Sequence, residues 1–131
     1  MQLEQKETYL DLRSNPVLAE RTSAHLAGIG FTEDRVVPWA RTGSTDVGDV
    51  SYAAPTLHPE FAIADEGIGP HTHAFREAAV SSRGEQAMLQ AAEVLARVGA
   101  DVILDADVRR RVRDAFIAQP MHRTEWTGSG A

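Results

Sequence analysis

The sequence predicts an α/β fold in which three main helices accompany a few short strands. Apolar residues recur at helical spacing in two stretches of the last third of the chain, and Ser14-Asn15-Pro16 is typical of a helix start. The extended stretches are short, at 35–39 and 61–64. The last two helices carry apolar stripes that so few strands would cover poorly. The chain is therefore expected to be part of a larger domain.

The first helix is expected to start with Asn15 as its N-cap and Pro16 at its first position, and to end at Gly28 and Gly30. One face of this helix carries the apolar residues and a histidine: Val17, Leu18, His25, Leu26 and Ile29.

The middle of the chain is less regular. Small and polar residues without periodicity predict a turn over 42–46, and the pattern of 47–54 fits a helix or a strand. A strand is expected over 61–64, after Pro59. A loop containing Gly67, Gly69 and Pro70 then precedes two histidines, and such a loop is expected at a functional edge.

The last third predicts two helices. The first starts at Glu85 and ends near Gly99, and its buried stripe is expected to be Met88, Ala91, Ala92, Leu95 and Val98. The second is capped by Asp105 and stopped by Pro120, with a buried stripe of Leu104, Val108, Val112, Ala115 and Phe116.

Composition excludes several classes of function. The 131 residues contain no cysteine and carry a formal net charge of -6, so neither a thiolate metal site nor a nucleic-acid partner is expected. The basic cluster Arg109, Arg110, Arg111 and Arg113 is better explained as a solvated helix face. No apolar run approaches the roughly 20 residues that span a bilayer. We expect a cytoplasmic protein without a membrane partner.

The residues that could carry chemistry are few. His71 and His73 could reach one metal ion if the backbone between them is extended, with Asp46, Asp49, Asp65 or Glu66 as oxygen donors. Surface or hydrogen-bonded histidines are the simpler explanation, and for His25, His58 and His122 it is the stronger one. Ser44 lacks the second glycine of a nucleophile elbow, so a polar turn explains it better.

Two sequence blocks resemble the zinc-dependent amidohydrolases that include aminoacylases, p-aminobenzoyl-glutamate hydrolases and β-alanyl-lysine dipeptidase-like metallopeptidases. The first is Gly43-Ser44-Thr45-Asp46-Val47-Gly48-Asp49-Val50-Ser51-Tyr52, and the second is His71-Thr72-His73-Ala74-Phe75-Arg76-Glu77-Ala78-Ala79. The helices on either side follow in the order of that family. The resemblance implies the C-terminal part of an α/β/α-sandwich catalytic domain over 13–126, after the end of a lid domain over 1–12. The small residues of 127–131 separately predict a flexible tail.

The resemblance also implies roles for single residues. His71 matches the last zinc ligand of the family, and His73 is expected to act beside the metal or the substrate. Ser44, Thr45 and Asp46 match the loop that lines the metal and substrate cleft, and Asp49 is a weaker candidate there. In such two-metal sites the zinc ions polarise the scissile amide carbonyl and lower the pKa of the attacking water.

The family's other motifs are missing from this chain. It has no His-x-Asp sequence for the remaining metal ligands and no Glu-Glu pair for the general base. We therefore expect a partial hydrolase of an N-acyl amino acid or small dipeptide, inactive without an N-terminal portion and holding zinc only with the ligands of that portion. Two alternatives remain: a non-catalytic remnant that self-associates or binds a partner, and a small metal-binding module built on His71 and His73.

Overall fold

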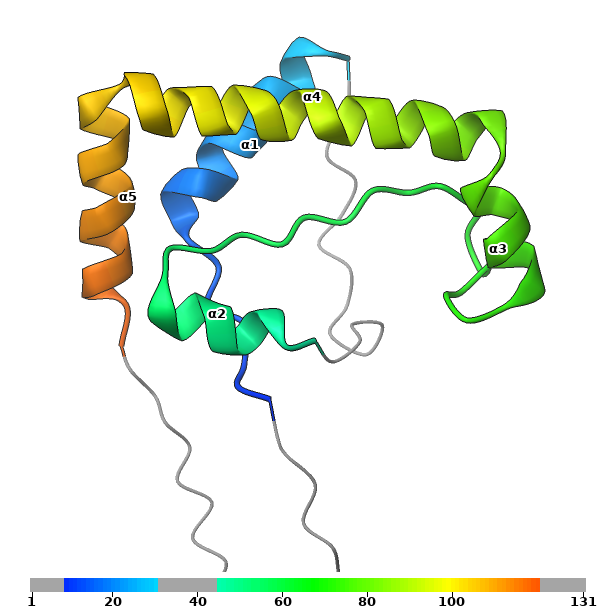
Figure 1. Cartoon of the computed structure of the whole chain (residues 1–131), viewed down its shortest axis with the longest axis horizontal. Coiled ribbons are helices and arrows are strands. Elements are labelled where there is room, and N and C mark those ends of the chain that lie inside the picture. The colour runs from blue at the N-terminus through cyan, green and yellow to red at the C-terminus, as the bar shows by residue number, and fades with distance from the viewer. Residues whose placement is uncertain (1–8, 31–44, 121–131) are drawn as a thin grey trace, which may run out of the picture.

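The computed structural model describes residues 9–30 and 45–120, which form a helix-rich arrangement. Its helices are α1 (Pro16–Gly28), α2 (Val47–Ala53), α3 (His73–Ala79), α4 (Ser82–Leu104) and α5 (Ala106–Ala118). Figure 1 shows α4 as a long bar, with α5 descending from one end, α3 at the other, and a non-helical stretch running beneath it toward α3. None of the described helices is long and apolar enough to cross a membrane.

Side-chain caps explain where four of these helices begin. Asn15 Oδ1 accepts hydrogen bonds from the backbone N–H groups of Val17 and Leu18, and Asp105 Oδ1 accepts from Asp107 and Val108. Both caps were predicted from the sequence and are confirmed. Thr72 and Ser81 cap α3 and α4 in the same way, through Phe75 N and Gly84 N. The caps satisfy N–H groups that have no partner inside a helix.

The core lies where α1 and α5 meet. Val17, Val108 and Val112 are buried there, and Leu18, Val102 and Ala115 pack around them. α1 contacts both α4 and α5, and these two helices also contact each other. The predicted buried residues Val108 and Val112 of α5 are thus confirmed, whereas Leu104, expected in the same stripe, is 82% exposed.

Arg13 connects the residues before α1 to α2 and α5. Its backbone N–H donates to Ser51 Oγ at 3.0 Å, and its Nη2 donates to the carbonyl oxygen of Gln119 at 2.9 Å. The guanidinium carbon lies 4.6 Å from the ring centroid of Tyr52 and 5.7 Å from that of Phe116. A cation between two aromatic rings gains attraction from both, so the Arg13 side chain links Tyr52 of α2 to Phe116 of α5.

The extent and the buried face of α4 differ from the prediction. The helix runs to Leu104 instead of ending near Gly99, because the loss of about 1 kcal/mol from one interior glycine is too small to stop a helix packed along its length. The buried residues are Gly84, Ala87 and Val94, while Met88 and Leu95 are each 63% exposed. Apolar residues cover two adjacent faces of α4, and spacing alone could not tell which face packs on α1.

The predicted strand at 61–64 does not form within the described part of the chain. The stretch after α2 contains a single isolated parallel bridge, between Ser14 and Thr56, and residues 57–64 belong to no strand ladder there. A strand needs a neighbour to hydrogen-bond with, and α1 and α4 beside this stretch offer only side chains. The open choice over 47–54 is settled as the helix α2. The stretch 35–39 lies outside the described residues.

Gly48 provides a test of how closely the residues before α1 pack on α2. A Cβ atom at Gly48 would overlap the carbonyl oxygen of Leu10. We expect Gly48→Ala to lower the free energy of unfolding by about 2–3 kcal/mol, since backbone would have to move. Gly99→Ala is the control: a Cβ there meets nothing within 4 Å, so it should raise stability by about 0.5–1 kcal/mol. Urea unfolding measures both, and equal effects would contradict the packing.

Candidate functional site

His71 lies in the loop that enters α3 and adopts a strained backbone. Its φ is 65°, in the left-handed region that residues with a Cβ seldom occupy. The side chain is exposed and forms no hydrogen bond or ion pair with any described residue. Non-glycine residues in strained conformations cluster at functional sites.

His73 is the first residue of α3, and its side chain is also exposed. The prediction that both histidines could face one ion depended on an extended backbone between them. That condition is not met, because His71 is left-handed and His73 already belongs to a helix. Thr72 between them is extended and caps α3. The two imidazoles are therefore close in sequence without forming the expected pair on one face of a strand.

Thr45 and Asp46 lie at the entry to α2. Thr45 Oγ1 accepts a hydrogen bond from Val47 N at 3.3 Å and lies 3.5 Å from Asp46 Oδ1. The carboxylate of Asp46 does not cap the helix and is exposed. Asp49, the weaker candidate, accepts from the backbone N–H of Leu10 at 3.1 Å, which gives it a structural role. Ser44 lies outside the described residues.

The structure does not bring His71 and His73, at the start of α3, together with Thr45 and Asp46, at the start of α2. Among the described helices, α3 contacts α4 but not α2. Asp65, a possible oxygen ligand, is paired with Arg83 at 2.8 Å. Across 9–30 and 45–120, no cluster of three or more histidine, aspartate or glutamate side chains could hold a metal ion. These residues therefore do not make a zinc site by themselves, and His71 could serve only as one ligand among others supplied from elsewhere.

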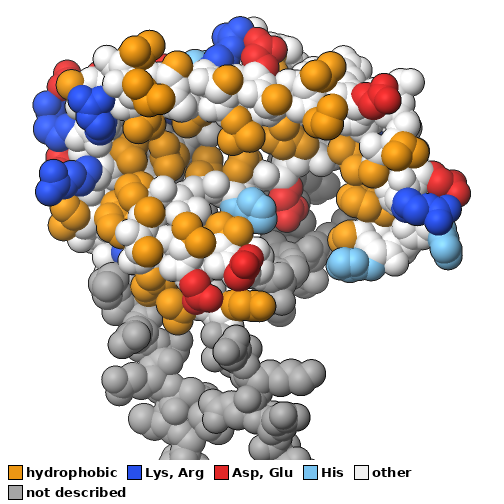
Figure 2. Space-filling model, viewed as in Figure 1, with side chains coloured by type: hydrophobic (Ala, Val, Ile, Leu, Met, Phe, Trp, Pro, Cys, Tyr) orange, Lys and Arg blue, Asp and Glu red, His pale blue; other side chains and the backbone are white. Residues whose placement is uncertain are grey.

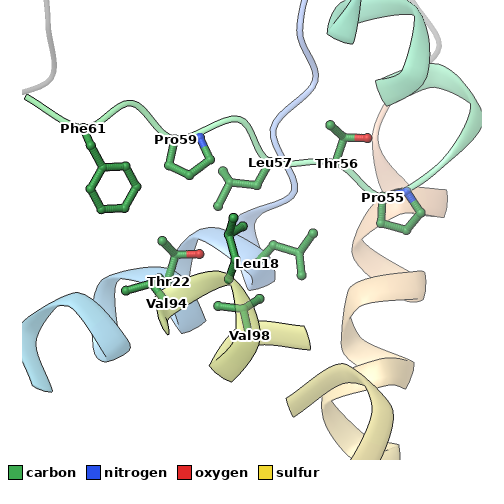
Figure 3. Close-up of a pocket in the computed structure, with 10 residues that line it drawn as sticks. Leu18, Thr22, Pro55, Thr56, Leu57, Pro59, Phe61, Val94 and Val98 are labelled. Carbon is green, nitrogen blue, oxygen red and sulfur yellow. The ribbon is translucent and has the colours of Figure 1, made fainter. Parts of the chain in front are cut away.

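A mostly apolar hollow of about 260 Å³ lies between the helices and the stretch after α2. Figure 3 shows Leu57, Pro59 and Phe61 of that stretch above Leu18 and Thr22 of α1 and Val94 and Val98 of α4. The only polar side chains in its lining are two threonines, Thr22 and Thr56. With no charged group at hand, the hollow is suited to apolar side chains rather than to catalysis. No sequence pattern indicated this hollow, because its lining comes from three separate stretches.

Asp101 of α4 holds α1 through a single carboxylate oxygen. Arg21 Nε donates to Asp101 Oδ2 at 2.8 Å, and His25 Nε2 lies 2.7 Å from the same oxygen. The hydrogen bond from Arg21, followed by that from His25, holds the pKa of Asp101 below its ordinary value. His25 is thus a structural, hydrogen-bonded histidine, as expected. The sequence did not predict its partner, which is 76 residues away.

The lowered pKa of Asp101 predicts a loss of stability in acid. An aspartate with a lowered folded pKa stabilises the fold above its ordinary value, roughly 4, and loses that contribution as pH falls toward the folded value. We expect Asp101→Asn to be less stable than the wild type at pH 7 and the difference to shrink at pH 3. Urea unfolding at both pH values measures this, and an unchanged difference would contradict the ionic role of Asp101.

Comparison with known proteins finds similarity to dipeptidases over part of this chain. Over 89 residues the chain is 34% identical to the human Xaa-Arg dipeptidase and 35% identical to the mouse Xaa-Arg dipeptidase. The matched stretch covers 68% of this chain and 20% of each dipeptidase, so it spans about a fifth of the length of these relatives. No protein-family profile matches the chain. The similarity supports a dipeptidase or amidohydrolase relationship in general terms.

Proposed function

We propose that this chain is the C-terminal part of the catalytic domain of a zinc-dependent amide hydrolase, which cleaves a small dipeptide or an N-acyl amino acid. The observation that carries the proposal is the identity of 34–35% over 89 residues to two Xaa-Arg dipeptidases. The name of these relatives makes a dipeptide ending in arginine the first substrate to test. Because the matched stretch is a fifth of their length, activity is assigned to the chain only together with the rest of the enzyme.

In this proposal the chain supplies His71 as one metal ligand. The strained backbone and the exposed imidazole of His71 support this role, because an exposed side chain is free to meet ligands from another polypeptide segment. Ser44, Thr45 and Asp46 line the substrate cleft, and His73 lies beside it. The exposed carboxylate of Asp46 and the exposed imidazole of His73 are compatible with these roles.

The chain does not supply the remaining chemistry. It has neither a His-x-Asp sequence nor a Glu-Glu pair, and its described residues hold no three-ligand cluster. When bound, zinc would polarise the amide carbonyl. The rest of the enzyme supplies the other metal ligands and the general base that accepts a proton from the attacking water. The same proposal includes the architecture: the helices described here form part of one α/β/α sandwich.

Mixing with a relative tests the proposal. The partner is the human Xaa-Arg dipeptidase from which the matching 89 residues have been removed, called the truncated human dipeptidase below. With zinc present, we expect hydrolysis of a dipeptide ending in arginine by the mixture and by neither component alone. An inactive mixture in which the two polypeptides nevertheless bind would contradict the proposed activity.

A second candidate is a non-catalytic domain that binds a partner or a second copy. The observation in its favour is the number of large apolar side chains that the described part leaves exposed, including Val80, Leu89, Ile103 and Ile117, each between 66% and 77% exposed. Such surfaces mark interfaces. This candidate predicts self-association of the isolated chain and no hydrolysis in any mixture.

A further inference from the structure

One face of α4 is apolar and exposed along most of the helix. We call it the outer face, because helical spacing turns it away from the buried Ala87 and Val94; its residues are Met88, Leu89, Ala92, Ala96, Ala100 and Ile103. Its three large side chains are 63%, 66% and 74% exposed. Figure 1 shows α4 in front of α1 with no described element drawn across it, and Figure 2 shows apolar side chains along its length.

Charged side chains border the outer face in a pattern that divides it in two. Glu85 and Glu93 border its N-terminal half, and both are exposed. Arg97 borders its C-terminal half and donates to Glu93 Oε1 at 2.6 Å. Arg109 reaches back from α5, and its Nη1 donates to two carbonyl oxygens in the last turn of α4, each at 3.0 Å. The face is thus acidic toward one end and basic toward the other.

The other charged groups of α4 are engaged away from the outer face. Arg83 pairs with Asp65 at 2.8 Å, and Asp101 is held by two side chains of α1. Asp105, which follows the helix, turns its carboxylate into the cap of α5. The division into an acidic and a basic half is therefore set by the two glutamates and two arginines that border the face.

We propose that two copies of this chain associate through the outer faces of α4, packed antiparallel about a two-fold axis at the level of residue 95. Glu93 of each copy then lies beside Arg97 of the other, and Glu85 lies beside Arg109. A two-fold axis produces each of these contacts twice, because both copies use the same surface. A parallel pairing would instead place Glu93 against Glu93, and like charges across an interface cost binding energy.

The sizes of the side chains fit the same arrangement. Ala92 and Ala96 lie close to the axis, where small side chains let two helices approach to the usual distance of about 8–10 Å. Farther from the axis, Leu89 of one copy lies at the level of Ala100 of the other, so a large side chain meets a small one. The antiparallel pair thus covers the apolar side chains that each copy leaves exposed.

This inference goes beyond the proposed function and does not depend on it. None of the residues of the outer face, and none of the four charged residues beside it, has a proposed role at the metal or the substrate. Association of the chain and hydrolysis by the mixture with the truncated human dipeptidase are therefore separate measurements, and substitutions in the outer face address the first of them.

Sedimentation equilibrium of the full chain over a series of concentrations tests the association. We expect a dimer, and we expect Leu89→Lys to weaken it at least about tenfold, because the pair would bury a charge without a partner. Val80→Lys is the matched control: Val80 is 77% exposed and lies outside the outer face, so this variant should dimerise like the wild type. Circular dichroism checks that both variants keep their helices.

Mixing two charge variants tests the antiparallel arrangement. Glu93→Arg and Arg97→Glu each place like charges across the axis, so each variant alone should associate at least about tenfold more weakly than the wild type. An equal mixture of the two should recover association, because every arginine of one copy then meets a glutamate of the other. The ion pair within each helix stays broken in the mixture, so recovery reports only the contact between copies. Glu77→Arg on α3 is the control for the change in charge and should have no effect.

Each outcome supports or overturns the pairing. A wild-type chain that stays monomeric throughout the series would overturn it, as would a dimer that Leu89→Lys leaves intact. A dimer whose charge variants do not recover on mixing would overturn the antiparallel arrangement. A chain that dimerises as expected but restores no hydrolysis with the truncated human dipeptidase would support this inference and contradict the proposed activity. A chain that restores hydrolysis but remains monomeric alone would do the reverse.

Discussion

Replacing Asn15 with alanine is expected to destabilise the chain by about 3 kcal/mol. Asn15 is completely buried, and its side chain makes three hydrogen bonds: Oδ1 accepts from Val17 N and Leu18 N, and Nδ2 donates to the carbonyl oxygen of Val112 at 2.9 Å. Loss of an N-cap costs about 1 kcal/mol, and leaving a buried polar group without its partner costs about 1–3 kcal/mol more. Urea unfolding followed by circular dichroism measures the change.

Asn15→Asp separates the two roles of this residue. Aspartate keeps the cap of α1 but cannot donate to Val112, so the loss should come mainly from the contact between α1 and α5. Asn15→Ser keeps the cap and removes the longer side chain that reaches α5. If alanine, aspartate and serine all changed the free energy of unfolding by less than about 0.5 kcal/mol, the described packing of α1 on α5 would be wrong.

Replacing His71 with glycine is expected to separate folding from function most sharply. Glycine adopts a positive φ without a steric penalty, so the variant should be as stable as the wild type or more stable by about 1 kcal/mol. Hydrolysis by the mixture with the truncated human dipeptidase should nevertheless fall more than about 100-fold. Even groups that only support a metal ligand typically contribute 10–100-fold, and a ligand contributes more.

His58→Gly is the control for His71→Gly. His58 is an exposed histidine in a non-helical stretch, and it carries no proposed role at the metal. Its replacement should leave zinc binding unchanged. A His71→Gly variant that kept full activity in the mixture would remove His71 from the metal site, whereas a variant that failed to fold would contradict the strain attributed to its backbone.

Local signals predicted where α1 and α5 begin. Asn15 followed by Pro16, and Asp105 before an apolar stripe, specify helix starts within four residues, so the caps of α1 and α5 follow from sequence alone. The basic cluster of α5 also lies on an exposed face, as expected, with Arg110 paired to Asp107 and Arg111 paired to Glu20.

Non-local contacts account for what was missed. The register of α4 depends on which of two apolar faces meets α1, and Asp101 selects it by binding Arg21 and His25 from 76–80 residues away. The strand predicted over 61–64 needs a neighbouring strand that the described residues do not contain. The candidate site residues stayed apart for a related reason, since α2 and α3 share no contact. Periodicity reports the preference of a segment and cannot report its partner.

Zinc titration by calorimetry tests the central claim most directly, with the chain alone, with the truncated human dipeptidase alone, and with their mixture. The account predicts weak binding to either polypeptide and tight, stoichiometric binding to the mixture, lost when the chain carries His71→Gly. The same tight binding in mixtures with wild-type and His71→Gly chains would show that the chain contributes no ligand, and would contradict the assignment of a metal-dependent hydrolase site to it.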